Sequence, residues 1–174
     1  ARIYGYFGIT HYLTGDYTKA LQAHEKSLQW RQEIGDKAGI AASYNSIGNI
    51  YYKTENYQKA LQFYQKGLKI REEIEGIYGI AETRFNIGRI HLLLKNYRPA
   101  TEYLNSSLQL ASDANLSEII KKNYEYLSSA FAQQGRYKAA LDYYKRFSAL
   151  EDSIRARKAS REITELNIKY QSEK

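Results

Sequence analysis

The sequence of 174 residues contains no cysteine and no methionine, and Pro99 is its single proline. Without cysteine the chain has no disulfide, no thiolate nucleophile and no cysteine-type zinc site. A domain that needs no disulfide can lie on either side of a membrane, so the localisation stays open between the cytoplasm and an extracytoplasmic sensor portion of a membrane protein. The absence of methionine predicts that the sequence is a piece of a longer protein.

Long hydrophobic runs and a signal-peptide pattern are also missing, so we predict no membrane insertion of this part of the protein. The net charge of +7 comes mainly from the last third of the chain, where 12 Lys and Arg face 7 Asp and Glu in residues 121–174. Such an excess can attract nucleic acid or anionic lipid, but a solvated helix face explains it more simply.

A repeat of 40 residues organises the sequence. Four units align without a gap, at 1–40, 41–80, 81–120 and 121–160. The residues that coincide are Ala20, Ala60, Ala100 and Ala140, then Tyr17, Tyr57, Tyr97 and Tyr137, and then Gly8, Gly48 and Gly88 with Ser128 in the fourth unit. A repeat of this length predicts a solenoid built from one structural unit.

Each unit is predicted to contain two helices. Apolar residues fall at unit positions 4, 7, 8 and 11 and again at 17, 20, 21, 24 and 28, a three-and-four spacing typical of helical stripes. Short polar turns such as Thr14-Gly15-Asp16 separate the two stripes. Small residues at positions 8 and 20 would let the two helices approach closely. We therefore expect an all-α fold, a right-handed superhelix of four helical hairpins.

The units resemble the tetratricopeptide repeat (TPR) family. The residues that carry this resemblance in the second unit are Tyr44, Ile47, Gly48, Tyr51, Ala60, Tyr64 and Gly67. The family's standard unit has about 34 residues, so the extra residues predict a second helix extended through segments such as 33–40. This longer unit is similar to repeats of G-protein-signalling modulators and of bacterial peptide-sensing regulators. The resemblance implies that peptides or helical protein segments are the partners.

The residues after position 160 do not begin a fifth unit. No glycine or proline occurs between Tyr137 and Lys174, which predicts one long helix. Within it, a coiled-coil spacing is followed by Ala156, Ala159, Ile163, Leu166 and Tyr170. Residues 161–174 are therefore either a helix that caps the last repeat or the start of a coiled-coil connector, and a homodimer through this helix also stays open. Residues 162–170 resemble the linker after TPR arrays in bacterial sensor kinases and helix-turn-helix regulators.

The resemblance implies that the first helices line a concave groove, where unit positions 2, 5, 9, 12 and 13 would meet a ligand. The predicted peptide-binding residues are Tyr12, Asn45, Asn49, Tyr52, Lys53, Phe85, Arg89 and Glu125. An asparagine amide can donate to and accept from a peptide backbone, and Arg89 can grip a carboxylate with two hydrogen bonds. The alternative is that Asn45 and Asn49 are ordinary residues of the repeat.

Catalysis is not predicted. The three histidines, His11, His24 and His91, fall at packing positions of the repeat, and no carboxylate recurs beside them at metal or triad spacing. The glycines follow the repeat and form no phosphate-binding loop. We expect no catalytic residue, no metal, no cofactor and no small-molecule substrate.

The sequence thus predicts a protein- or peptide-binding module, as the sensory or scaffolding part of a larger bacterial signalling protein such as a histidine kinase or a helix-turn-helix regulator. A structural dimerisation module and a nucleic-acid-associated regulator that uses the basic C-terminal third are the alternatives. Nucleic acid is the less favoured partner, because most of the 18 tyrosines fall at packing positions.

Overall fold

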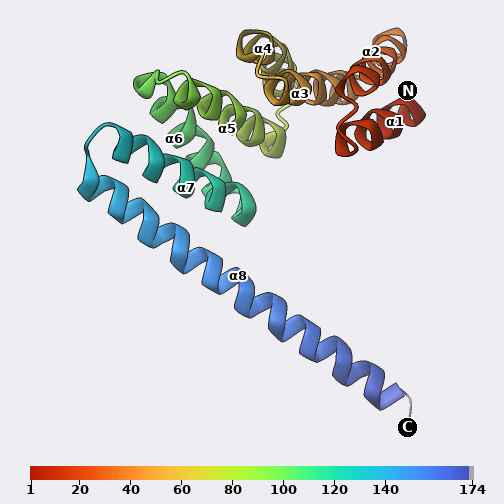
Figure 1. Ribbon diagram of the computed structural model, residues 1–174. Coiled ribbons are helices and arrows are strands. Elements are labelled where there is room, and N and C mark those ends of the chain that lie inside the picture. The colour runs from red at the N-terminus through yellow and green to blue at the C-terminus, as the bar shows by residue number, and fades with distance from the viewer. Residues whose placement is uncertain (173–174) are drawn as a thin grey trace.

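The computed structural model describes residues 1–172, which form eight α-helices and no β-strand. The helices are α1 (Arg2–Leu13), α2 (Tyr17–Glu33), α3 (Lys37–Lys53), α4 (Tyr57–Glu73), α5 (Ile77–Leu93), α6 (Tyr97–Asp113), α7 (Ser117–Gln133) and α8 (Tyr137–Ser172). They pair as consecutive hairpins that stack into a curved array, with α8 running far beyond the last hairpin (Figure 1). The predicted all-α superhelical solenoid is confirmed.

The chain reverses direction every 20 residues, each time through one residue with a left-handed backbone. These residues are Gly15, Gly35, Glu55, Glu75, Lys95, Asn115 and Gly135. The expectation that the second helices extend through segments such as 33–40 is wrong: α2 ends at Glu33 and α3 begins at Lys37. Gly35 turns the chain, and the Asp36 carboxylate then accepts a hydrogen bond from the Gly39 N–H, which starts a new helix. The extra residues of the unit therefore also lengthen the first helices.

Within a hairpin, the glycine at position 8 lies directly under a large side chain of the partner helix. A Cβ atom added at Gly48 would come within 2.7 Å of the Tyr64 ring, and one added at Gly88 within 2.8 Å of Leu104 Cγ. Both Tyr64 and Leu104 are fully buried. The close approach expected from small residues at this position is present.

Two glycine substitutions should therefore shift stability in opposite directions. Gly88→Ala is expected to lower the free energy of unfolding, because overpacking costs about 1–3 kcal/mol against a helix-propensity gain of at most about 1 kcal/mol. Gly5→Ala should raise it by up to about 1 kcal/mol, since the nearest atoms lie 3.7 Å from the added Cβ. Urea unfolding measures both, and a shift of the same sign in the two variants would contradict the packing described.

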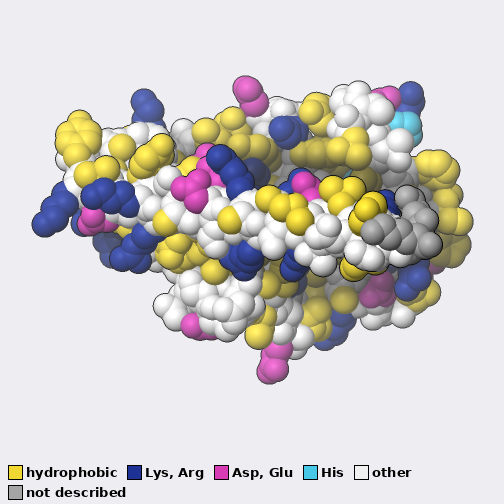
Figure 2. Space-filling model, turned by 90° about the horizontal axis from the view of Figure 1, so that it is seen from below, with side chains coloured by type: hydrophobic (Ala, Val, Ile, Leu, Met, Phe, Trp, Pro, Cys, Tyr) yellow, Lys and Arg dark blue, Asp and Glu magenta, His cyan; other side chains and the backbone are white. Residues whose placement is uncertain are grey.

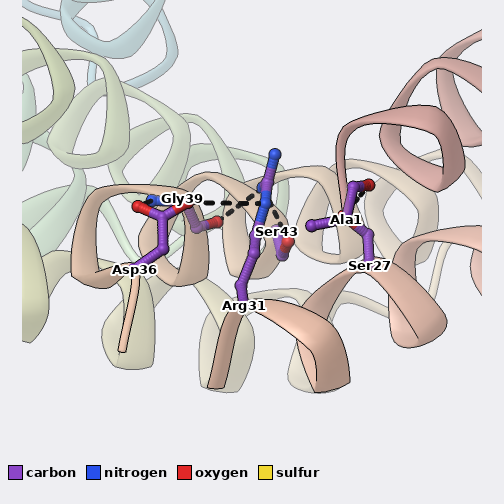
Figure 3. A network of polar contacts seen from close by, with 6 residues as sticks. All are labelled: Ala1, Ser27, Arg31, Asp36, Gly39 and Ser43. Atoms are coloured by element: carbon purple, nitrogen blue, oxygen red, sulfur yellow. Dashed lines mark hydrogen bonds and ion pairs between the residues drawn. The ribbon is translucent and has the colours of Figure 1, made fainter. Parts of the chain in front are cut away.

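The junction between the first two hairpins depends on Arg31, shown in Figure 3. Its Nη1 donates to the Gly39 carbonyl at 2.6 Å and to Ser43 Oγ at 2.9 Å, so an α2 side chain holds the first turns of α3. Arg71 occupies the same place in the next junction and pairs with Glu82 of α5 at 3.6 Å. In the third junction Ala111 stands at the unit position of Arg31 and Arg71, and Ile119 stands at that of Gly39. An apolar cluster of Ala81, Ala111 and Ile119 forms there instead of the polar contacts.

His24 fills the space beside Gly8, and burial lowers its pKa, with the nearby Arg31 charge lowering it further. A histidine with a lowered pKa in the folded state binds a proton more readily in the unfolded chain. The free energy of unfolding therefore falls once the pH is low enough for the unfolded chain to bind that proton. Stability should thus fall as the pH drops through about 6.5, the ordinary value for histidine. His24→Tyr, which carries the tyrosine of units two and four, should lose part of this pH dependence in urea unfolding at a series of pH values. An unchanged dependence would contradict the assignment.

The last helix leaves the solenoid halfway along its length. Residues 155–171 are all exposed, so α8 covers no repeat along this stretch. Residues 173 and 174, the end of the predicted segment 161–174, lie outside the described part of the chain. Lys158 and Arg155 pair along the helix with Glu162 and Glu151. Among the described helices, including α8, none combines the length and apolar character needed to cross a membrane.

Candidate peptide-binding cleft

A cleft of about 400 Å³ opens on the side of the molecule formed by the first helix of each hairpin. Every residue that lines it comes from α1, α3, α5 or α7. The second helices of the hairpins lie behind this row. The resemblance to TPR proteins implied this division, in which first helices face the concave side. A volume of this size is within the range of about 300–1,000 Å³ typical of ligand pockets.

Seven of the eight predicted groove residues are brought together here. The lining includes Tyr12, Asn49, Tyr52, Lys53, Phe85, Arg89 and Glu125. Asn45 is not among them: it is buried, with 7% of its surface exposed. Helix α4 comes close to α3 at this point, because Gly67 lacks a side chain and lies against Asn45. Asn45 is thus part of the packing between helices and does not face the cleft.

Other residues complete the lining, and the sequence pattern did not single them out. They are Tyr78, Glu82, Asn86, Glu118, Ile119, Lys122 and Tyr126. Tyr78, Glu118 and Ile119 lie in the first turns of α5 and α7, which the 40-residue frame had assigned to the preceding second helix. If the chain reversal between two units is placed four residues earlier in the repeat, these three residues belong to a first helix and fall on its groove face.

Arg89 is the central cation of the cleft. Its guanidinium carbon lies 3.7 Å from the centre of the Tyr52 ring and 5.7 Å from that of Phe85, a cation–π arrangement that fixes the side chain. The Nε atom is buried and has no hydrogen-bond partner. Burial raises the pKa of Tyr64 and of Tyr126, and the charge of Arg89 opposes this rise at both phenols. These phenols stay protonated around neutral pH and keep their capacity to donate hydrogen bonds.

Asn49 is held in a fixed orientation next to Arg89. Its Oδ1 accepts a hydrogen bond of 2.6 Å from the Tyr64 hydroxyl, and Tyr64 itself is fully buried in α4. The NH₂ group of the same amide can then donate to a guest in the cleft. The second helix of the hairpin therefore positions a donor that the first helix presents.

The charges of the cleft do not balance once their existing partners are considered. Glu82 pairs with Arg71 at 3.6 Å, and Glu118 pairs with Lys121 at 3.6 Å. The ion pairs found within residues 1–172 involve none of Lys53, Arg89, Lys122 and Glu125. Three cations thus stand against one carboxylate, and this excess favours a guest with a negatively charged group.

Aromatic rings form the remaining wall. Tyr12 and Tyr52 are half-buried at one end of the cleft, and Tyr78 is exposed at the edge. Phe85 is buried and packs edge-on against Tyr126, with ring centres 5.1 Å apart, so it supports the wall more than it contacts solvent. Tyrosine offers an apolar face and a hydroxyl together, which suits recognition of a peptide side chain.

The described residues contain no group of three or more His, Asp or Glu side chains that could hold a metal ion. His24 is buried beneath Gly8, and His91 stacks on Tyr103 with ring centres 5.8 Å apart. Burial lowers the pKa of both histidines. These two therefore occupy packing positions, as the repeat frame predicted.

Known structures share this fold. RapI in its apo form superposes with a TM-score of 0.84 at 20% identity, over 91% of this chain and 58% of RapI. The Rap conjugation gene regulator of plasmid pLS20, in complex with the Phr* peptide, gives 0.73 at 20% identity, over 84% and 41%. A signal transduction ATPase from Pyrococcus horikoshii with a tetratricopeptide repeat sensor gives 0.79 at 21% identity, over 91% and 25%. The chain spans less than two thirds of each of these proteins, and the likeness at this identity concerns the fold.

Sequence comparisons give a consistent result. No curated protein matches the chain closely enough to count as a relative. The family model described as "Tetratricopeptide repeat" matches residues 1–73. The one described as "Tetratricopeptide repeat protein 21 forth ARM domain" matches residues 44–172, which is most of the chain. With its hairpins, its repeat and these matches, the chain belongs to the tetratricopeptide repeat family.

Proposed function

We propose that the chain is a peptide-binding module that holds a segment of another protein, or a free peptide, in the cleft of its first helices. The observation that carries the proposal is the half-buried cation Arg89, which lines the cleft against the ring of Tyr52 and beside the fixed amide of Asn49. A bidentate cation and an amide donor side by side can bind a carboxylate and a peptide carbonyl together. The module has no catalytic role in this proposal.

The wider context is part of the same proposal. The module acts as the sensory or scaffolding part of a larger bacterial signalling protein, a histidine kinase or a helix-turn-helix regulator. Two structural neighbours support a sensory module within a larger protein: the Rap regulator was solved with a peptide, and in the P. horikoshii ATPase the repeat array is a sensor. In both, the matched part is less than half of the protein, as expected for a recognition module within a longer chain.

Selection from a random peptide library displayed on phage, with the immobilised chain as bait, tests the proposal. We expect enrichment of peptides that combine an acidic side chain or a free C-terminal carboxylate with an aromatic residue, because the cleft has three uncompensated cations and several tyrosines. Enriched peptides should compete with one another for a single site. Enrichment of basic peptides, or of none, would count against the cleft as a peptide site.

A salt titration separates this function from binding of nucleic acid by the basic α8. Affinity for a nucleic acid falls steeply with salt, because each neutralised phosphate releases counterions. A peptide that makes one charged contact and several apolar contacts in the cleft should weaken only modestly. Fluorescence anisotropy with a selected peptide and with a single-stranded oligonucleotide measures both. Tight oligonucleotide binding with a steep salt dependence would favour the alternative.

A further inference from the structure

Basic side chains are spread over the surface of the molecule. On the side that Figure 2 shows, Lys and Arg side chains lie among acidic and hydrophobic ones. Several of these cations already have a carboxylate partner on another helix: Lys37 pairs with Glu73 at 3.2 Å, and Arg84 pairs with Glu72 at 2.9 Å. The cations that line the cleft of the first helices differ from these, because no carboxylate of the described chain pairs with them.

Three cations from three different first helices meet around this one cavity. Arg89 of α5 is half-buried, whereas Lys53 at the end of α3 and Lys122 of α7 are exposed. The Phe85 ring lies close to two of them: its centre is 5.7 Å from the Arg89 guanidinium carbon and 5.9 Å from Lys122 Nζ. The same guanidinium carbon lies 3.7 Å from the ring centre of Tyr52, the residue before Lys53. The positive charges are therefore concentrated at one place.

The size of the charge excess distinguishes between kinds of anion. Of the three carboxylates in the lining, Glu82 and Glu118 are already paired, with Arg71 and Lys121 respectively. Only Glu125 is left to oppose the three cations, so the cavity keeps an excess of two positive charges. A single carboxylate of a guest neutralises half of this excess. A phosphate monoester carries a charge of about −1.5 to −2 at neutral pH and matches it.

Neutral hydrogen-bond donors accompany the cations. The Tyr64 hydroxyl occupies Asn49 Oδ1 at 2.6 Å, so the NH₂ group of this amide is the part that can bind an anion. Burial raises the pKa of Tyr126, although the Arg89 charge opposes the rise, so this hydroxyl in the lining stays protonated and can donate. Phosphate offers three acceptor oxygens that point in different directions, which suits donors arriving from α3, α5 and α7.

We propose that the group recognised in the cleft is a phosphate monoester on a side chain of the guest peptide, bound by Arg89 together with Lys53 and Lys122. This inference rests on the peptide-binding function proposed above and names the chemical class of the group that the cleft prefers. Peptides with a single carboxylate occupy the same place more weakly. Two neighbouring carboxylates bring the same charge but divide it between two groups, whereas Arg89 and Lys122 both lie beside the ring of Phe85.

Fluorescence anisotropy with four peptide pools tests the proposal. The pools share the same random flanking positions and differ at the centre, which is phosphoserine, phosphotyrosine, one glutamate or two glutamates. At least one phosphorylated pool should bind about tenfold more tightly than either glutamate pool, the effect of one added charge-assisted hydrogen bond. Equal affinity of a glutamate pool would overturn the phosphate assignment and leave peptide binding intact, whereas binding of none of the pools would contradict both.

Exposed substitutions then locate the phosphate. Lys53→Met with Lys122→Met should remove the preference for the phosphorylated pool, and Glu125→Gln should strengthen it, because the first change lowers the positive charge of the cleft and the second raises it. Lys69→Met with Lys145→Met removes two exposed cations outside the cleft and should leave the preference unchanged. Circular dichroism checks that the variants stay folded. An undiminished preference in the Lys53 and Lys122 variant, or displacement of the bound phosphopeptides by a single-stranded oligonucleotide, would overturn the proposal.

Discussion

Replacing Asn49 and Arg89 together with alanine is expected to abolish capture of cleft-binding peptides while the chain stays helical. A hydrogen bond to a charged group contributes about 1.5–3 kcal/mol and a neutral one about 0.5–1.5 kcal/mol. Loss of both contacts should therefore lower affinity about 100-fold or more, since each 1.4 kcal/mol is a factor of ten. Isothermal calorimetry with a peptide selected against the unchanged chain measures the loss.

Two controls keep this result interpretable. Gln65→Ala with Lys69→Ala removes the same two kinds of group from the exposed face of α4 and should leave affinity unchanged. Asn49→Ala also leaves the buried Tyr64 hydroxyl without its acceptor. Asn49→Asp with Arg89→Met keeps that acceptor and most of the packing on Tyr52 and should lose binding just as strongly. Full affinity in this folded variant would count against the cleft.

Tyr64→Ala should cost more stability than any surface change in the molecule. Tyr64 is fully buried, packs over Gly48 and joins the cluster with Ile87 and Ile90 that links two hairpins. Removal of a large buried aromatic side chain costs about 3–5 kcal/mol. Because a solenoid is stabilised by contacts between neighbours, the loss should separate the unfolding of the first two hairpins from that of the rest.

Urea unfolding followed by far-UV circular dichroism measures this effect, and Tyr64→Phe provides the matched control. Phenylalanine keeps the packing and removes the hydroxyl that donates to Asn49 Oδ1, so its cost should be about 1–3 kcal/mol. A loss with Tyr64→Ala no larger than with Tyr64→Phe would show that the ring does not support the junction between hairpins.

The fold could be predicted from the sequence because a solenoid repeats one local solution four times. Small residues recur at unit positions 8 and 20, and large residues recur at unit positions 17 and 24. In every unit these positions indicate the same contact between the two helices of the hairpin. The turns between units could not be placed as well. Glu75 and Asn115 adopt the left-handed backbone without being glycine, so the residue that reverses the chain between these units is not marked by its type. The stacking of the hairpins, more than local propensity, holds the chain in these turns.

The cleft was predicted in outline and with one misplaced residue. Unit positions 9 and 12 were expected to face the groove, and four residues at these positions line the cleft, because the helical period fixes which residues share a face. They are Asn49, Arg89, Tyr12 and Tyr52. Asn45 lies on the edge of that face, and whether such a residue is exposed depends on how closely α4 approaches, which Gly67 determines. Pairing of Glu82 with Arg71 across two hairpins also lies beyond a reading of periodicity.

Binding in the concave cleft is tested most directly by NMR of the arginine and tyrosine side chains during titration with a selected peptide. The account predicts that the Arg89 Nε–H signal and the ring signals of Tyr12 and Tyr52 shift with one common dissociation constant, while signals from α4, α6 and the distal part of α8 stay in place. Shifts confined to the second helices or to α8, with Arg89 unmoved, would contradict it.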